Sequence, residues 1–216
     1  MTAAAAALVY AAMWTGWAHS WAWLTAVDDW LLNALYPIGA TNPTWVTCWN
    51  VFCTVFGPNA FRLFGVAVIV WLLTRRRLQA ALFLVLSLEL SGLVTTVAKL
   101  FADRSRPPTA MVDALGSSFP SGHAVGVMVA VLALLTVGLP LLTQRWRPAL
   151  IVTGAVLVVL IGFGRVVLNV HHPSDVVAGW ALGYLWYLVC LVAVRPGPLT
   201  KVTATCETPA VPGSGS

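Results

Sequence analysis

The chain has 216 residues, of which 59% are hydrophobic and only 9% are charged, and its mean hydropathy is +0.86. This composition excludes an ordinary soluble domain and predicts an all-α integral membrane protein. The formal net charge is +5, but the basic residues are dispersed between apolar segments, so we expect the lipid bilayer as a partner and no nucleic acid. The length allows several spans of about 20 residues and little else. We therefore expect one membrane domain over residues 1–195 and a polar, disordered cytoplasmic tail over 196–216.

The first half of the chain predicts three membrane helices. The first covers residues 3–24, and a short helix at the membrane surface follows over 30–36. The second begins near Trp45 or Phe61 and ends at residue 74, and the Gly57-Pro58 pair should bend or interrupt it. The third covers residues 78–100 and carries Glu89. A carboxylate at mid-membrane costs about 2.5 to 3.5 kcal/mol, so we expect Glu89 to face the bundle interior in a structural role, protonated or hydrogen-bonded.

The second half of the chain predicts three further membrane helices, so we expect a bundle of six transmembrane helices. Residues 101–119 form the longest polar connection and must lie outside the hydrocarbon. The fourth helix follows the Pro-Ser-Gly-His turn and ends before Gln144, the fifth covers 148–168 and the sixth covers 175–194. The four cysteines lack metal-ligand spacing and are interpreted as packing residues: Cys48, Cys53, Cys190 and Cys206.

The basic residues orient this bundle. One side collects Arg75, Arg76, Arg77, Arg145, Arg147, Arg195 and Lys201. By the positive-inside rule this side, and with it both termini, is cytoplasmic. Three connections then deliver polar residues to the extracytoplasmic face: Lys99, Arg104, Arg106, Ser121, His123, Arg165, His171, His172 and Asp175.

The start of the fourth helix predicts an anion site on that face. Ser121 and Gly122 should lie in its first turn, where free N–H groups and the helix dipole favour a phosphate. Lys99, Arg106 and Arg165 can then surround a tetrahedral dianion with positive charge.

Two histidines and a carboxylate could carry out chemistry on a phosphate bound at this site. His171 and Asp175 are four residues apart, so on one helix face the carboxylate can hold one imidazole nitrogen and leave the other as a nucleophile. His123 comes from a different helix and can donate a proton to a leaving oxygen. His172 should point elsewhere, although spacing alone does not exclude it as the nucleophile. Asp103 and Arg104 are interpreted as solvated loop charges.

Three motifs in order carry a family resemblance. They are Lys99 to Arg106-Pro107, then Pro120 to His123, then Gly164-Arg165 through His171 to Asp175. With these the chain resembles the type 2 phosphatidic acid phosphatase superfamily, the membrane lipid-phosphate phosphatases related to vanadium haloperoxidases. The third motif of that family usually opens with serine, so Gly164 removes a hydroxyl contact to phosphate.

The resemblance implies a role for each matching residue. It selects His171 over His172 as the nucleophile that forms a phosphohistidine, with Asp175 orienting it and His123 as general acid. It assigns phosphate binding to Lys99, Arg106, Ser121, Gly122 and Arg165. It implies no metal and no cofactor, and six transmembrane helices with an outward-facing site.

The leading hypothesis is an integral membrane phosphatase that hydrolyses a lipid phosphomonoester or pyrophosphate at the outer face of a bacterial cytoplasmic membrane. Phosphatidic acid, phosphatidylglycerol phosphate and undecaprenyl or other polyprenyl pyrophosphates are candidate substrates. Two alternatives stay open: a polyprenyl-type phosphotransferase, and a non-catalytic protein that binds or transports lipid phosphates. Vanadium haloperoxidase chemistry is disfavoured, because those relatives are soluble. The sequence does not predict the oligomeric state.

Overall fold

Helices are the only regular elements over residues 2–196, the part of the chain that the computed structural model describes. The expected tail therefore lies outside the described residues, apart from Pro196. The α-helices are α1 (Ala3–Ala18), α2 (Ala22–Thr41), α3 (Pro43–Val55), α4 (Pro58–Thr74), α5 (Leu78–Leu84), α6 (Ser91–Ala102), α7 (Gly122–Gly138), α8 (Arg147–Val167) and α9 (Pro173–Val194). A π-helix (Val85–Glu89) and two 3₁₀ turns (Leu139–Leu141 and Gln144–Trp146) join some of them.

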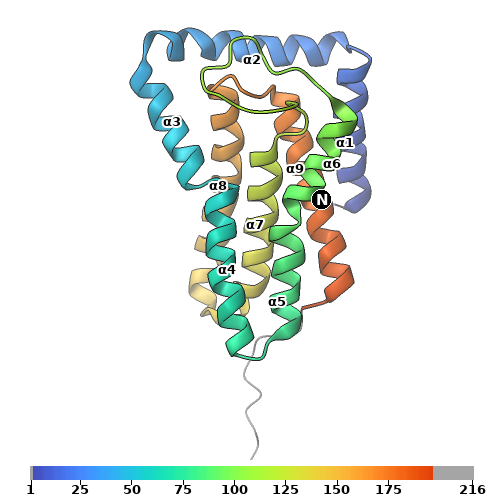
Figure 1. The fold of residues 1–216 in the computed structure, drawn as a ribbon, viewed down its shortest axis with the longest axis vertical. Helices are drawn as coiled ribbons and strands as arrows, with labels where there is room; N and C mark the ends of the chain where they lie inside the picture. Colours follow the sequence, from blue (N-terminus) through green and yellow to red (C-terminus); the bar gives the residue numbers. More distant parts are fainter. Residues whose placement is uncertain (1, 197–216) are drawn as a thin grey trace, which may run out of the picture.

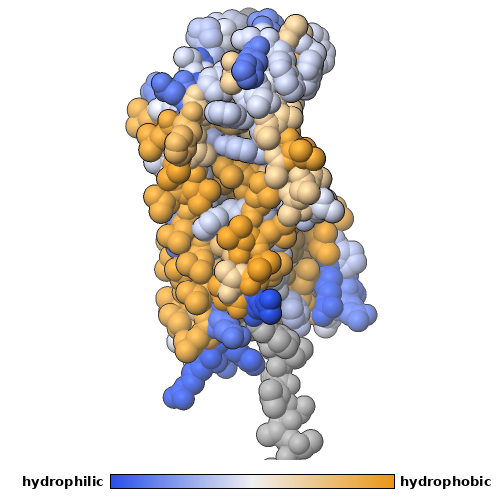
Figure 2. Space-filling model, turned by 90° about the vertical axis from the view of Figure 1, so that its right-hand side faces the viewer, coloured by the Kyte–Doolittle hydropathy of each residue, from blue (hydrophilic) through white to orange (hydrophobic). Residues whose placement is uncertain are grey.

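Five helical segments are long and apolar enough to cross a membrane. They are Pro43–Thr74, Leu78–Ala102, Gly122–Leu141, Gln144–Val167 and Pro173–Val194. They match the second to sixth expected spans. On the face drawn in Figure 2, apolar side chains cover the middle of the molecule and hydrophilic ones gather at its two ends, as an integral membrane protein requires.

The first expected span is shorter than the sequence indicated. The prediction of one helix over residues 3–24 is wrong, because α1 ends at Ala18 and the chain turns at Ser20, whose φ is 50°, into a second helix. Helix α1 packs along α9, and its first residues lie at about mid-height of the bundle (Figure 1). With 16 residues it falls below the length of a regular span, so the count of six spans stays a prediction.

Helix α2 lies across one end of the bundle (Figure 1). The prediction of a short helix over residues 30–36 is wrong in extent, because α2 has 20 residues and continues through Pro37. Its buried residues Leu24, Asp28 and Leu32 are spaced by four, so they form one inward stripe, whereas Trp23 and Trp30 are exposed. An amphipathic helix with exposed tryptophans suits a membrane interface.

The next two spans are interrupted helices. Asn42 caps α3 by accepting a hydrogen bond from the N–H of Trp45 at 3.3 Å, and α3 ends just before Gly57, so the expected interruption at Gly57-Pro58 is confirmed. The third span contains the π-helical turn that ends at Glu89. Glu89 is half-buried, and its buried Oε1 has no hydrogen-bond partner among the described residues. Of the two expected alternatives, a protonated or a hydrogen-bonded carboxyl, no hydrogen bond is found at Oε1.

Helix α7 forms the centre of the bundle and sets the position of the polar end. It packs against α9, α8, α4 and α6, and nine of its 17 residues are buried. Its contact with α9 is close because a Cβ atom at Gly179 would lie only 2.7 Å from Ala124 Cβ and 2.8 Å from the Ser121 carbonyl oxygen. At the same crossing the N–H of Ser121 donates to the carbonyl of Asp175 at 3.0 Å. The first turns of α7 and α9 are thereby fixed to each other.

The basic turns lie at the opposite end from α2. The α4–α5 turn with Arg75–Arg77 and the C-terminal end of α9 with Arg195 are both at that end in Figure 1. This arrangement agrees with the expected topology, in which that end is cytoplasmic. The orientation in the membrane itself stays a prediction.

The α7–α9 crossing gives a stability prediction. Gly179→Ala should lower the free energy of unfolding by about 1 to 3 kcal/mol, because the added methyl group meets backbone and Cβ atoms that cannot move aside. Thermal unfolding in detergent measures the effect. The control is Gly138→Ala in α7, where nothing lies within 4 Å of the added atom, and which should be neutral or stabilising. Equal melting temperatures for the two variants would contradict the close packing.

Candidate active site

Residues from five segments meet at the end of the bundle that α2 covers. They come from the last turns of α6 and α8, the loop of residues 103–121, the first turn of α7 and the junction of α8 with α9 (Figure 1). The loop is tied to the α8–α9 junction by hydrogen bonds from the Met111 N–H to the Leu168 carbonyl, 3.1 Å, and from Thr109 Oγ1 to Asn169 Oδ1, 2.9 Å. Motifs that are far apart in the sequence thus lie close together at this end of the bundle.

Three cations lie around this place. Lys99 Nζ donates to the carbonyl oxygen of Ser117. Arg106 donates to three backbone carbonyls at 2.8 to 3.1 Å, from Nε to Gly116, from Nη2 to Leu115 and from Nη1 to Val170. Arg165 is buried, and its Nε has no hydrogen-bond partner among the described residues. The loop carbonyls hold Lys99 and Arg106 in place without neutralising them.

The first turn of α7 faces these cations. No side chain caps this helix, and Ser121 is fully buried with an Oγ that lacks a hydrogen-bond partner within residues 2–196. His123, the second residue of the helix, interacts electrostatically with Arg165, His171, Arg106 and Lys99. Its ring also lies against Gly57, at the break between α3 and α4. A buried hydroxyl and uncapped N–H groups beside three cations form an anion-binding environment.

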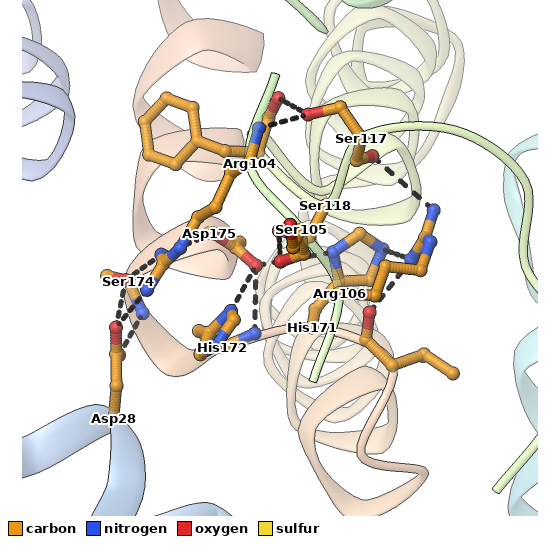
Figure 3. Close-up of polar contacts among 12 residues, drawn as sticks. Asp28, Arg104, Ser105, Arg106, Ser117, Ser118, His171, His172, Ser174 and Asp175 are labelled. Atoms are coloured by element: carbon orange, nitrogen blue, oxygen red, sulfur yellow. Dashed lines mark hydrogen bonds and ion pairs between the residues drawn. The ribbon is translucent and has the colours of Figure 1, made fainter. Parts of the chain in front are cut away.

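His171 lies between Arg106 and Asp175. Its Nε2 is 3.3 Å from Arg106 Nη1, and its Nδ1 is 3.6 Å from Asp175 Oδ2 (Figure 3). An arginine can only donate, so this contact favours the tautomer with a lone pair on Nε2 and the proton on Nδ1. Burial lowers the pKa of His171 to about 4, against the opposing effect of Asp175. Burial also lowers the pKa of Arg106, and Asp175 raises it.

His172 contacts the same carboxylate, so the prediction that it points elsewhere is wrong. Helix α9 begins only at Pro173, and His172 is its N-cap residue rather than a residue one helical step from His171. Its N–H donates to Asp175 Oδ2 at 2.8 Å, and its Nδ1 is 3.2 Å from the same oxygen. The two histidines differ in their other neighbours, because His171 faces Arg106 whereas His172 lines a polar cavity of about 390 Å³ beside α2.

Arg104 is not the solvated loop charge that the sequence predicts. It is only 9% exposed and forms ion pairs with Asp28 of α2, 2.9 Å, and Asp175 of α9, 2.7 Å. Sequence reasoning missed Asp28 as well, because 76 residues separate it from Arg104 and nothing in the local pattern links them. Asp103, by contrast, is exposed as expected.

The structure gives a steric reason for Gly164. A Cβ atom there would lie 2.6 Å from Cys53 Sγ and 2.8 Å from the Trp49 ring, so α3 occupies the space where a side chain would stand. Cys53 is fully buried and also interacts with Arg165, consistent with its expected packing role.

The family is established by comparison with known proteins. The sequence model of the PAP2 superfamily matches residues 80–196, and the chain belongs to this superfamily. A crystal structure described as the first transmembrane PAP2 type phosphatidylglycerolphosphate phosphatase from Bacillus subtilis has the same fold: its TM-score is 0.73 at 23% identity, over 89% of this chain and 96% of that one.

The names of three curated relatives refer to three different lipid substrates. An undecaprenyl-diphosphatase of Sulfolobus acidocaldarius is 30% identical over 61% of this chain, and phosphatidylglycerophosphatase B of Bacillus subtilis is 33% identical over 53%. The matches span only 63% and 58% of those two proteins. A lipid A 1-phosphatase of Rhizobium johnstonii is 31% identical over 77% of this chain and 76% of its own length.

The packing at Gly164 gives a prediction about the site. Gly164→Ser should lower the melting temperature by several degrees without raising phosphatase activity, because the new side chain would meet Cys53 and Trp49. Adding Cys53→Ala should restore part of the stability, since it removes the nearest atom. Thermal unfolding of the single and double variants checks this. A stable Gly164→Ser protein would show that α3 yields at this position.

Proposed function

We propose that the protein is a membrane lipid phosphatase that hydrolyses a phosphomonoester or pyrophosphate of a lipid through a phosphohistidine intermediate. The observation that carries the proposal is the convergence of three cations and an uncapped helix N-terminus around His171, whose Nε2 faces Arg106. A phosphate dianion is the group that this arrangement suits best. Three fixed positive charges also supply the neutralisation that a metal ion would give, so we propose that turnover needs no metal.

In the proposed reaction, a phosphate displaces the Arg106 contact at His171 Nε2, and Lys99, Arg106 and Arg165 bind its oxygens. Nε2 then attacks phosphorus while the bond from phosphorus to the lipid oxygen breaks. His123 gives its proton to the leaving oxygen. Water next attacks the phosphohistidine and passes a proton to His123, which restores both histidines and releases orthophosphate. Asp175 stabilises the positive charge on His171 throughout.

A lipid substrate is supported by the surroundings of His123. Its ring lies against the α3–α4 break, and an apolar hollow lined by Val55, Phe56, Ala60, Phe61 and Phe64 lies at that break. Phe61 and Phe64 also line a larger apolar groove of about 400 Å³ among α4, α7 and α8. The leaving oxygen would thus lie on the side from which a hydrocarbon chain can extend into the bilayer.

We propose that the end of the bundle that carries the site faces the outer leaflet of a bacterial cytoplasmic membrane. Helix α1 would then complete the count of six spans, and both termini would be cytoplasmic.

The first functional test is phosphate release from phosphatidic acid, phosphatidylglycerol phosphate and undecaprenyl pyrophosphate by purified protein in EDTA. We expect release from at least one lipid and a loss of about 1,000-fold or more in His171→Ala, because this variant lacks the proposed nucleophile. His172→Ala is the matched control, and we expect it to lose much less. The proposal fails if the wild type is silent on all three lipids, and a Mg²⁺ requirement would reject metal independence.

The pH dependence of kcat/KM tests the state of His171. Its ordinary pKa is about 6.5, and in the fold it is lowered to about 4, so the nucleophile is neutral above pH 4 and is lost only as the pH falls through that value. We therefore expect no acid limb from His171 between pH 7 and 5 when kcat/KM is measured with a short-chain lipid phosphate. An acid limb centred near pH 6.5 that belongs to His171 would contradict this.

A further inference from the structure

Arg104 joins two acidic residues that come from different ends of the chain. Its Nη1 donates to Ser174 Oγ and to Asp175 Oδ1, both at 2.7 Å, and its Nη2 donates to Asp28 Oδ2 at 2.9 Å (Figure 3). The guanidinium also lies over the ring of Trp17, 5.9 Å from its centre. The side chain is therefore held on several sides and is not free to reach a substrate.

Asp28 holds this arginine from the side of α2. It is only 2% exposed. Its Oδ1 accepts the N–H of Ser174 at 2.9 Å, and its Oδ2 accepts the Ser174 hydroxyl at 2.5 Å in addition to Arg104. Both carboxylate oxygens thus have donors, and the second acid balances the charge that Arg104 brings into the buried site. Through these contacts α2 is attached to the first turn of α9.

The two oxygens of Asp175 have separate partners. Oδ1 accepts from Arg104, whereas Oδ2 faces His171 Nδ1 and the backbone and ring of His172. The last torsion of an aspartate is broad, so the direction of Oδ2 is fixed only if another group holds the carboxylate. With Oδ1 held by Arg104, Oδ2 stays directed at His171.

We propose that Arg104, anchored by Asp28, is a positioning residue for the His171–Asp175 pair. It fixes the Asp175 carboxylate so that Oδ2 stays directed at His171 Nδ1. The imidazole proton is thereby kept on Nδ1, and Nε2 is left free to attack phosphorus. This inference rests on the proposed function for its kinetic consequence, but the geometry it describes exists without a substrate. Arg106, two residues along the chain, has the contrasting task, since its Nη1 faces the reactive Nε2.

The kinetic test compares Arg104→Gln, Arg104→Lys and Arg145→Gln on the best lipid substrate. Loss of a group that orients a metal-binding histidine typically costs about 10- to 100-fold. By analogy we expect kcat to fall by about that factor in Arg104→Gln, with KM changed less than about threefold. Arg104→Lys should recover part of the rate, because lysine keeps the charge but not the fork of donors. Arg145 is exposed at the other end of the bundle, and its variant should behave as wild type.

Asp28 has a matched control beside it. We expect Asp28→Asn to lower kcat less than Arg104→Gln does, and the double variant to show less than the product of the two losses, because both act through one carboxylate. Asp29 is exposed, and Asp29→Asn should have no effect. Losses that multiply independently would overturn the coupling between Asp28 and Arg104.

A readout without turnover separates this inference from the proposed function. The pKa of His171, which also depends on Arg165 and Arg106, can be followed by NMR of histidine-labelled protein in detergent. It should shift in Arg104→Gln, because the Asp175 carboxylate that raises the pKa of His171 is then free to turn, and it should stay unchanged in Arg145→Gln. An unchanged pKa together with an unchanged kcat would reject the positioning role. A wild type silent on every lipid would reject the proposed function alone, and if Arg104→Gln does not fold, Arg104→Lys and Asp28→Asn carry both measurements.

Discussion

The buried carboxylate of Asp175 is the interaction on which the rest of this end of the molecule depends. It is fully buried, and a charge in that position is tolerated only when donors surround it. Arg104 of the loop and His172 of the α8–α9 junction supply those donors, and His171 Nδ1 lies 3.6 Å from the same carboxylate. Removing one partner of such a buried pair typically costs about 3 to 5 kcal/mol. The need to satisfy this single group therefore draws three segments of the chain together.

The cations of the site are held in a different way. Lys99 and Arg106 donate to carbonyl oxygens of the loop and of Val170, which carry no net charge. The positive charge is thus fixed in direction but not cancelled. Arg165 Nε and Ser121 Oγ are buried without partners in the described part of the chain, and buried polar atoms of that kind are uncommon. A site whose donors are already oriented needs little rearrangement when an anion arrives.

Helices α2, α3 and α4 shape the surroundings of the site although they carry none of the proposed catalytic residues. Helix α2 covers the polar end and contributes Asp28, and α3 fills the space beside Gly164 with Cys53 and Trp49. The break between α3 and α4 brings Gly57 against His123 and places apolar hollows just outside. Helix α2 thus covers the polar end of the bundle (Figure 1), whereas the α3–α4 break beside His123 is bordered by apolar side chains.

Long apolar runs determined most of the helices from the sequence alone, because a membrane span must satisfy its backbone internally and so has a fixed length and composition. The spans that became α7, α8 and α9 were predicted for this reason, and the interruption at Gly57-Pro58 was predicted because proline breaks a helix. Spaced motifs likewise indicated the residues that meet around His171. The extent of α2, the contact of His172 with Asp175 and the burial of Arg104 between Asp28 and Asp175 were decided only by the tertiary structure. Each depends on partners that lie outside the local pattern, and local periodicity or charge carries no information about which distant group will satisfy a buried charge.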